Sequence, residues 1–276
     1  MIAFRSLLCC LLLLLSLPSL ADSRCSERPK SLLLPAKISC SHQTTWIASG
    51  LVGARQVIYQ TPLGTPPAGG WPVVLVYQGS FFPLDNFTYY SNQPFGGFYE
   101  GKLVRTLLDN GYAVVAPSAP ADLFWQTNIP GLAQAYELST DYDFLGNVLA
   151  AIAVGHFGPL NPQRQYATGI SSGGYNSSRM AVSFPGRFRA LAIQSGSYAT
   201  CSGPLCVVPE LPADHPPTLF VHDMADRVVP WSSMQPYHDR LLYQSVETSR
   251  YTEPLGGHEW FAASPGKILA WFNAHP

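Results

Sequence analysis

The sequence predicts an α/β fold with a mostly parallel central sheet and helices on both faces of that sheet. Two observations lead to this prediction. Short apolar segments alternate with segments of helical periodicity along most of the chain, and such alternation gives parallel strands joined by crossover helices. Several of the short segments are apolar at nearly every position, as at residues 71–77, which is typical of strands buried on both faces.

The expected elements follow one another in a regular order. We expect strands at residues 56–60, 71–77, 112–116, 165–169, 190–194, 218–222 and 249–252. Helices are expected at residues 101–110, 141–157, 173–184 and 231–244, and a last helix has Ser264 as its N-cap. Residues 61–70 are rich in Pro and Gly and stand between two apolar runs, so they predict a long hairpin loop.

The composition argues against a nucleic-acid or membrane-surface partner. Apolar residues make up 47% of the 276 residues, charged residues only 12%, and the net charge is −1. No basic run longer than a pair occurs, so nothing complements a phosphate backbone or an anionic membrane surface. The apolar content is too high for a disordered chain, and the length suits one domain.

The first 21 residues have the layout of a secretory signal peptide. Arg5 precedes an apolar run at residues 7–15, and Ser19-Leu20-Ala21 supplies small residues before a polar Asp22. A bilayer span needs about twenty apolar residues, so this run is too short for a membrane anchor. We therefore expect cleavage after Ala21, and a secreted, extracellular catalytic domain at residues 22–276 that has no membrane association.

The cysteines that follow this leader are Cys25, Cys40, Cys201 and Cys206. An even number in an exported chain predicts disulfides, and four cysteines allow three pairings. Proximity favours Cys25–Cys40 and Cys201–Cys206, the second of which closes a loop at residues 202–205. Because no Cys-x-x-Cys occurs and the histidines are scattered, a metal site is not predicted.

The strongest chemical signal is Gly169-Ile170-Ser171-Ser172-Gly173, which matches Gly-x-Ser-x-Gly. It follows an expected strand and opens an expected helix, the setting of a nucleophile elbow. A sharp turn there exposes the hydroxyl of Ser171 above the sheet, and the glycines on either side relieve backbone crowding. The glycine spacing favours Ser171 over Ser172 as nucleophile, and the N–H of Ser172 becomes an oxyanion-hole donor.

A serine nucleophile needs a base and an orienting carboxylate, in the order Ser, acid, His. His258 lies between the last strand and the last helix and is preceded by two glycines, so it is the expected base. His222 and His238 fit this order poorly. The acid is Asp226 or Asp223; Asp226 is favoured because it lies further into its loop.

The three loops narrow the fold to the α/β-hydrolase type and place a second oxyanion donor after the strand at 71–77. That donor is the N–H of Gly79 or of Ser80, and the sequence does not choose between them. No metal or organic cofactor is expected for this chemistry.

The residues around these motifs resemble a known family. Residues 161–174 resemble the elbow region of secreted polyester depolymerases and feruloyl-type esterases, and the stretches at Asp226 and His258 resemble their acid and histidine loops. The Ile-Ser-Ser-Gly form, the chain length and the leader are most similar to the extracellular medium-chain-length polyhydroxyalkanoate depolymerases. The wider esterase group commonly has His-Gly where this chain has Gln78-Gly79, and again at 222–223.

The resemblance implies a hydrophobic polyester as substrate, hydrolysed through an acyl-enzyme. Aromatic residues crowd the segments after the oxyanion loop and the next strand, and we expect Phe81, Phe82 and Trp125 to bind the substrate. The alternative is that these aromatic residues form ordinary core under a long loop. Two other functions stay open: a secreted esterase for lipid, cutin-like, feruloyl or short-chain polyester substrates, and an inactive binding protein on the same fold.

Overall fold

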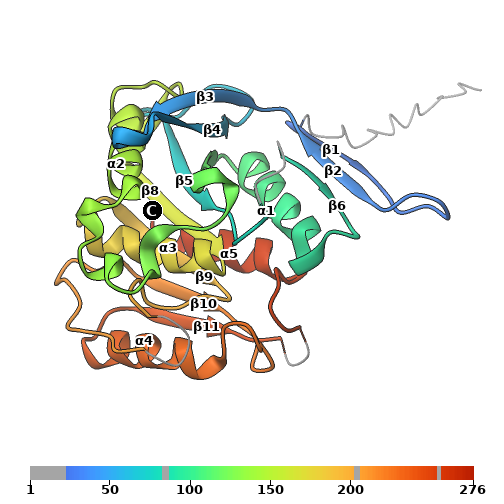
Figure 1. The fold of residues 1–276 in the computed structure, drawn as a ribbon. Coiled ribbons are helices and arrows are strands. Elements are labelled where there is room, and N and C mark those ends of the chain that lie inside the picture. The colour runs from blue at the N-terminus through green and yellow to red at the C-terminus, as the bar shows by residue number, and fades with distance from the viewer. Residues whose placement is uncertain (1–22, 83–86, 202–205, 254–255) are drawn as a thin grey trace, which may run out of the picture.

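The computed structural model describes residues 23–82, 87–201, 206–253 and 256–276. The strands of its main sheet are β3 (Gln43–Ala48), β4 (Ala54–Gln60), β5 (Trp71–Tyr77), β7 (Ala113–Pro117), β8 (Leu160–Ile170), β9 (Phe188–Gln194), β10 (Thr218–Val221) and β11 (Thr248–Tyr251). They form an eight-stranded sheet in the order β11-β10-β9-β8-β5-β7-β4-β3 (Figure 1). The strands from β11 to β7 pair in parallel, whereas β4 and β3 are antiparallel. The predicted α/β fold is confirmed.

Helices cover both faces of this sheet. They are α1 (Gly97–Asp109), α2 (Thr140–Ala153), α3 (Ser172–Ser183), α4 (Trp231–Tyr243) and α5 (Ser264–Ala274). The side chains of β5 alternate between two cores: Val74 and Val76 pack with α1 and α5, while Val73 and Leu75 pack with α2 and α3. Both faces of β5 are therefore buried, which explains why the strand is apolar throughout.

Two details of the sequence prediction were wrong. Residues 61–70 do not form a hairpin, because β7 lies between β4 and β5 in the sheet. Both strands pair with β7, β4 antiparallel and β5 parallel, and nearness in sequence did not reveal this insertion. Ser264 is the first residue of α5 rather than its N-cap, which is Ala263. The hydroxyl of Ser264 does not cap the helix; it accepts the N–H of Phe261 and donates to Gln194 Oε1.

A smaller antiparallel sheet lies beside α1 and was not predicted, because its strands are only three or four residues long. It consists of β1 (Cys25–Arg28), β2 (Lys37–Cys40) and β6 (Thr88–Tyr90), in that order. The structure contains both disulfides that proximity favours, Cys25–Cys40 and Cys201–Cys206. The first joins directly paired residues of β1 and β2. The expected leader, residues 1–21, and the loop at 202–205 lie outside the described residues.

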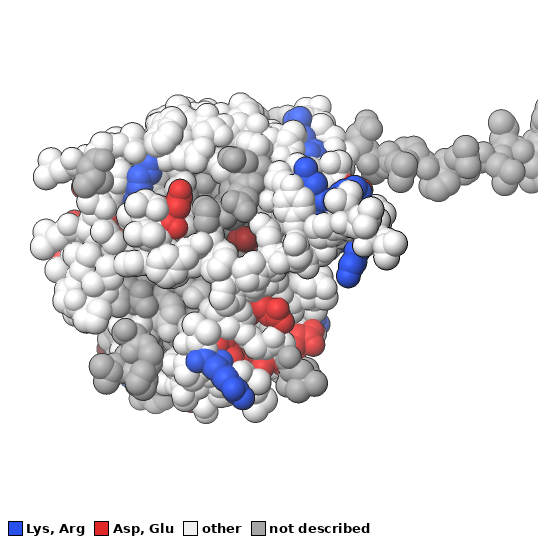
Figure 2. Space-filling model, turned by 45° about the vertical axis from the view of Figure 1, so that its right-hand side comes forward, with Lys and Arg blue, Asp and Glu red and all other residues white. Residues whose placement is uncertain are grey.

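The surface carries few charges, in keeping with the composition. Figure 2 shows scattered acidic and basic side chains on a face that is otherwise neutral. Within the described ranges, no helix combines the length and the apolar character needed to cross a bilayer.

Candidate active site

Ser171 lies in the sharp turn between β8 and α3. Its backbone angles are φ 55° and ψ −120°, a conformation that costs a non-glycine residue about 1–3 kcal/mol. The surrounding glycines make the turn sterically possible. A Cβ on Gly169 would lie 2.5 Å from the carbonyl oxygen of Tyr77, and one on Gly173 would collide with that same oxygen. The strand β5 therefore approaches the turn closely only because both positions are glycine.

Main-chain hydrogen bonds hold this turn in place. The N–H of Ser171 donates to the carbonyl of Gln194 at the end of β9, at 3.0 Å. The carbonyl of Ser171 accepts the N–H of Tyr175 at 3.0 Å and so starts α3. Ser172 is the first residue of that helix, and the N–H of a first helical residue has no partner within its helix. This N–H therefore lies at the positive end of the α3 dipole, beside the Ser171 side chain.

His258 and Asp226 come together from two loops. Nδ1 of His258 lies 2.8 Å from Oδ2 of Asp226, and because an ionised carboxylate only accepts, Nδ1 carries the proton. The other oxygen of Asp226 accepts the N–H groups of Val228 and Val229, each at 2.9 Å. The imidazole also contacts Phe95 edge to face, with ring centres 5.7 Å apart. Nε2 of His258 is thus the nitrogen left to accept a proton.

The environment of Asp226 favours its charged form. The carboxylate is almost fully buried, and burial alone would raise its pKa. The hydrogen bond and charge of His258, together with the N–H groups of Val229 and Val228, outweigh burial and lower the pKa of Asp226 below its ordinary value.

The competing residues serve other contacts. Asp223 accepts the N–H of Ala225 at 2.5 Å and the N–H of Gly256 at 2.8 Å, so it ties the acid loop to the loop that carries His258. His222 is fully buried, and its Nε2 donates to the carbonyl of Val229 at 2.8 Å. His238 lies within α4, against the ring of Phe220.

Ser171 and His258 open into one cavity of about 420 Å³. Gly79 and Ser80 line it too, and a Cβ on Gly79 would lie 3.8 Å from that of Ser171. The remaining wall is mainly apolar and consists of Phe81, Phe82, Tyr89, Gln93, Pro94, Phe95, Gly97, Glu100, Ile170, Val228 and Trp260. Phe81 is 65% exposed and Phe82 38%, so both are accessible to a ligand at this cavity.

Sequence comparison gives this chain its family. It is 80% identical over 275 residues to the poly(3-hydroxyoctanoate) depolymerase of Pseudomonas fluorescens, a match that covers 99% of each chain. The chain belongs to the poly(3-hydroxyoctanoate) depolymerase family. No protein-family model matches it.

Solved structures share the fold of this depolymerase family member at low sequence identity. The carboxylesterase of Bacillus cereus is similar with a TM-score of 0.57 and 10% identity, over 80% of this chain and 94% of that one. The S-formylglutathione hydrolase of Staphylococcus aureus has a TM-score of 0.57 and 12% identity, over 84% of this chain and 96% of that one. The fold is the α/β-hydrolase fold, as expected.

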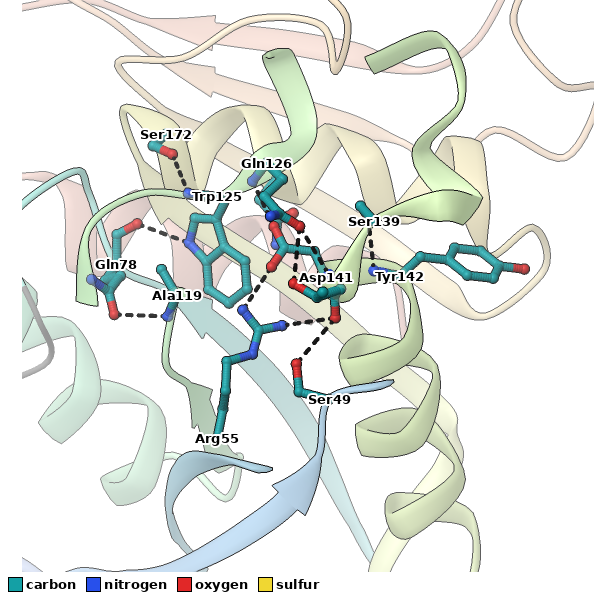
Figure 3. A network of polar contacts seen from close by, with 12 residues as sticks. Ser49, Arg55, Gln78, Ala119, Trp125, Gln126, Ser139, Asp141, Tyr142 and Ser172 are labelled. Carbon is teal, nitrogen blue, oxygen red and sulfur yellow. Dashed lines mark hydrogen bonds and ion pairs between the residues drawn. The ribbon is translucent and has the colours of Figure 1, made fainter. Parts of the chain in front are cut away.

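Trp125 does not have the position that we predicted from the sequence. It is fully buried, so it does not form part of an exposed aromatic rim. Its backbone N–H donates to Ser172 Oγ at 2.9 Å and its indole N–H donates to the carbonyl of Gln78 at 3.2 Å (Figure 3). Trp125 therefore joins the two segments that carry the candidate oxyanion donors.

The side chain of Gln78, which stands where the wider esterase group commonly has His, links two loops of the candidate site. This side chain is buried. Oε1 accepts the N–H of Ala119 at 3.1 Å, and Nε2 donates to the carbonyl of Asp122 at 3.1 Å. The amide thus fixes the loop after β7 against the loop after β5, which holds Gly79 in place.

A buried ion pair lies beside the ring of Trp125, and the sequence analysis did not predict it. Arg55 of β4 contacts Asp141 of α2 at 2.6 Å, and both side chains are buried. The other oxygen of Asp141 accepts the N–H of Gln126 at 2.5 Å (Figure 3). The Arg55 guanidinium also lies 5.8 Å from the Trp125 ring centre. In the sequence Arg55 stands just before the expected strand at 56–60 and Asp141 begins the expected helix at 141–157, and no local pattern pairs them.

Among the residues that the structure describes, His, Cys, Asp and Glu side chains do not form a group of three or more that could hold a metal ion.

Proposed function

We propose that this protein is a secreted serine esterase that hydrolyses medium-chain-length polyhydroxyalkanoates such as poly(3-hydroxyoctanoate). One observation carries the proposal: Ser171 and His258 share a cavity whose walls are mainly aromatic and aliphatic. An ester with alkyl side chains suits such walls, since the transfer of apolar surface out of water lowers the free energy. The 80% identity to the Pseudomonas fluorescens depolymerase supports this choice of polymer.

Acylation begins when Oγ of Ser171 attacks the ester carbonyl carbon and Nε2 of His258 takes the hydroxyl proton. Asp226 holds the imidazole at Nδ1 and stabilises its positive form. The oxyanion accepts the N–H of Ser172 and a second N–H from Gly79 or Ser80. When the tetrahedral intermediate collapses, the bond to the leaving alcohol breaks and His258 protonates that alcohol. A 3-hydroxyacyl ester remains on Ser171.

Deacylation repeats these steps with water. His258 takes a proton from a water molecule, which attacks the acyl carbon, and the same two N–H groups bind the new oxyanion. The bond to Ser171 Oγ then breaks, and His258 returns the proton to the serine. Ester and water account for every atom, so the reaction as written requires no metal or organic cofactor.

Phe81 and Phe82 are the side chains of this cavity that we propose to contact the alkyl substituents of the polymer. Both are partly exposed at its wall, and Phe82 contacts Phe95 edge to face at 4.7 Å between ring centres. Phe95 in turn contacts His258. The aromatic surface thus extends from solvent to the base, and a hydrophobic chain can follow it.

Secretion and domain extent belong to the same proposal. Removal of residues 1–21 leaves one catalytic domain at 22–276, and its two disulfides suit an oxidising extracellular compartment. Mass spectrometry of the protein from culture medium tests this, with Asp22 as the expected first residue. An intact leader on the exported protein would contradict it.

Clearing of polymer suspensions is the decisive experiment. Purified mature protein should clear poly(3-hydroxyoctanoate) and leave poly(3-hydroxybutyrate) turbid, while the Ser171→Ala variant should clear neither and keep the native circular dichroism spectrum. Clearing of neither polymer by the native protein, with p-nitrophenyl esters still hydrolysed, would reassign it to other esters. Activity retained by Ser171→Ala would refute the nucleophile.

A further inference from the structure

The turn between β1 and β2 exposes three consecutive leucines. Leu32 is 98% exposed, Leu33 88% and Leu34 50%. The turn is closed by two local hydrogen bonds: the N–H of Ser31 donates to the carbonyl of Leu34 at 2.9 Å, and the N–H of Leu34 donates to Ser31 Oγ at 3.2 Å. Leu32 and Leu33 therefore occupy the two central positions, where turns usually have Gly, Pro, Asn, Asp or Ser.

The hairpin that carries these leucines is braced. The Cys25–Cys40 disulfide joins the strands at the base, and Arg28 donates to the carbonyl of Pro35 at 3.0 Å near the tip. A run of three exposed apolar residues lowers solubility and is a fault in a soluble protein unless it has a function. A braced hairpin that presents such a run points to a binding role.

The hairpin is continuous with the wall of the candidate active site. Ile38 of β2 pairs with Tyr89 of β6, and Tyr89 lines the cavity. The chain then passes from β6 to Phe95, which lines the cavity beside His258. Figure 1 shows the hairpin of β1 and β2 projecting from the body of the molecule, with β6 between it and α1. The leucine tip and the cavity wall thus belong to one connected structural unit.

We propose that the leucine tip, residues 32–34, docks the enzyme on the solid polyester by inserting into its alkyl-rich surface. The inference rests on the proposed function, because a polymer with pentyl side chains presents an interface as apolar as the leucines. Insertion would remove their exposed surface from water and keep the cavity wall close to the particle. The tip itself carries no charge, although Arg28 and Lys30 lie beside it.

Adsorption of a double variant, Leu32→Ser/Leu33→Ser, to poly(3-hydroxyoctanoate) particles tests the inference. A Ser171→Ala background keeps the particles intact during the measurement. Leu51→Ser is the matched control, because Leu51 is a fully exposed leucine at a different site, a 3-10 helix between β3 and β4. We expect the double variant to adsorb at least about tenfold more weakly than the control, since the burial of one leucine side chain alone strengthens binding about tenfold or more. Adsorption of the unsubstituted tip should strengthen in sodium sulfate, which favours apolar burial.

Other outcomes would overturn the inference. If the native enzyme clears the polymer and the double variant adsorbs as well as Leu51→Ser, the tip is not the docking surface, although the proposed function stands. If the double variant made with Ser171 intact loses activity equally on particles and on soluble p-nitrophenyl octanoate, the hairpin supports the fold instead. Weaker binding only to phosphatidylglycerol vesicles would assign the tip to lipid, and loss of a dimer in light scattering would assign it to a second copy. Failure of the native enzyme to clear or adsorb is the separate failure of the proposed function.

Discussion

The two sides of the candidate site each contain a buried carboxylate, and the net shift of the pKa is opposite for the two. On the histidine side, the pKa of Asp226 is lowered, because His258 and the N–H groups of Val229 and Val228 outweigh burial. On the oxyanion side, the pKa of Asp141 is raised, because burial outweighs the charge of Arg55 and the N–H of Gln126. The surroundings thus stabilise the charged form of Asp226 relative to water, whereas they destabilise the charged form of Asp141.

This difference separates chemistry from support. A carboxylate that must stay charged beside an imidazolium gains from several donors. A buried ion pair contributes little net stability compared with apolar residues, but its rupture leaves an unpaired charge in the core. We therefore expect Asp226 variants to lose rate and Asp141 variants to lose stability.

The largest effect is expected for Asp226→Asn. An amide leaves the ring of His258 without its anionic partner and favours the wrong tautomer, so kcat for p-nitrophenyl octanoate should fall by about 10³- to 10⁴-fold. Thermal unfolding measured beside it should show a folded protein. Asp223→Asn is the matched control, with a clearly smaller loss of kcat, because the carboxylate of Asp223 accepts the backbone N–H groups of Ala225 and Gly256. If Asp223→Asn lost more kcat than Asp226→Asn, the acid would be Asp223.

Asp141→Asn, on the oxyanion side, should lower the stability of the fold. It leaves the guanidinium of Arg55 buried without its counter-charge, and we expect a loss of about 3–5 kcal/mol in the free energy of unfolding. Urea denaturation measures this loss. The double variant Arg55→Met/Asp141→Leu should recover much of it, because apolar residues replace the pair. No recovery would mean that the pair contributes stability beyond mutual neutralisation.

His215, which precedes β10 and contacts the hydroxyl of Tyr237 in α4, should make the fold sensitive to acid. Burial lowers the pKa of His215 from 6.5 to about 4, despite the Pro216 carbonyl and Asp214. The unfolded chain therefore binds a proton between these pH values that the folded chain does not, so stability rises with pH across that window. His215→Gln should remove up to about 3 kcal/mol of the stability difference between pH 6.5 and pH 4, measured by urea unfolding at each pH. An unchanged pH dependence would contradict the assignment.

The two sides also differ in how far the sequence predicts them. Ser171, Asp226 and His258 were predicted from local motifs because each lies in a loop or turn that follows an expected strand. The structure brings Asp226 and His258 into hydrogen-bond contact, as we expected. Arg55 and Asp141 lie 86 residues apart, and no local pattern links them. Trp125 was assigned to substrate binding because an aromatic-rich loop does not reveal which rings face inward.

Trp125→Phe tests the corrected role of that residue, which is positioning of the oxyanion side. The variant keeps an aromatic ring and the backbone N–H to Ser172 Oγ, and loses the indole N–H to the Gln78 carbonyl together with part of the buried ring volume. An unpaired buried carbonyl costs about 1–3 kcal/mol, which the loop before Gly79 can avoid by shifting. We expect kcat to fall about tenfold with KM nearly unchanged, because the oxyanion donors act in the transition state. A raised KM with native kcat would instead return Trp125 to the substrate-binding role that the sequence predicted.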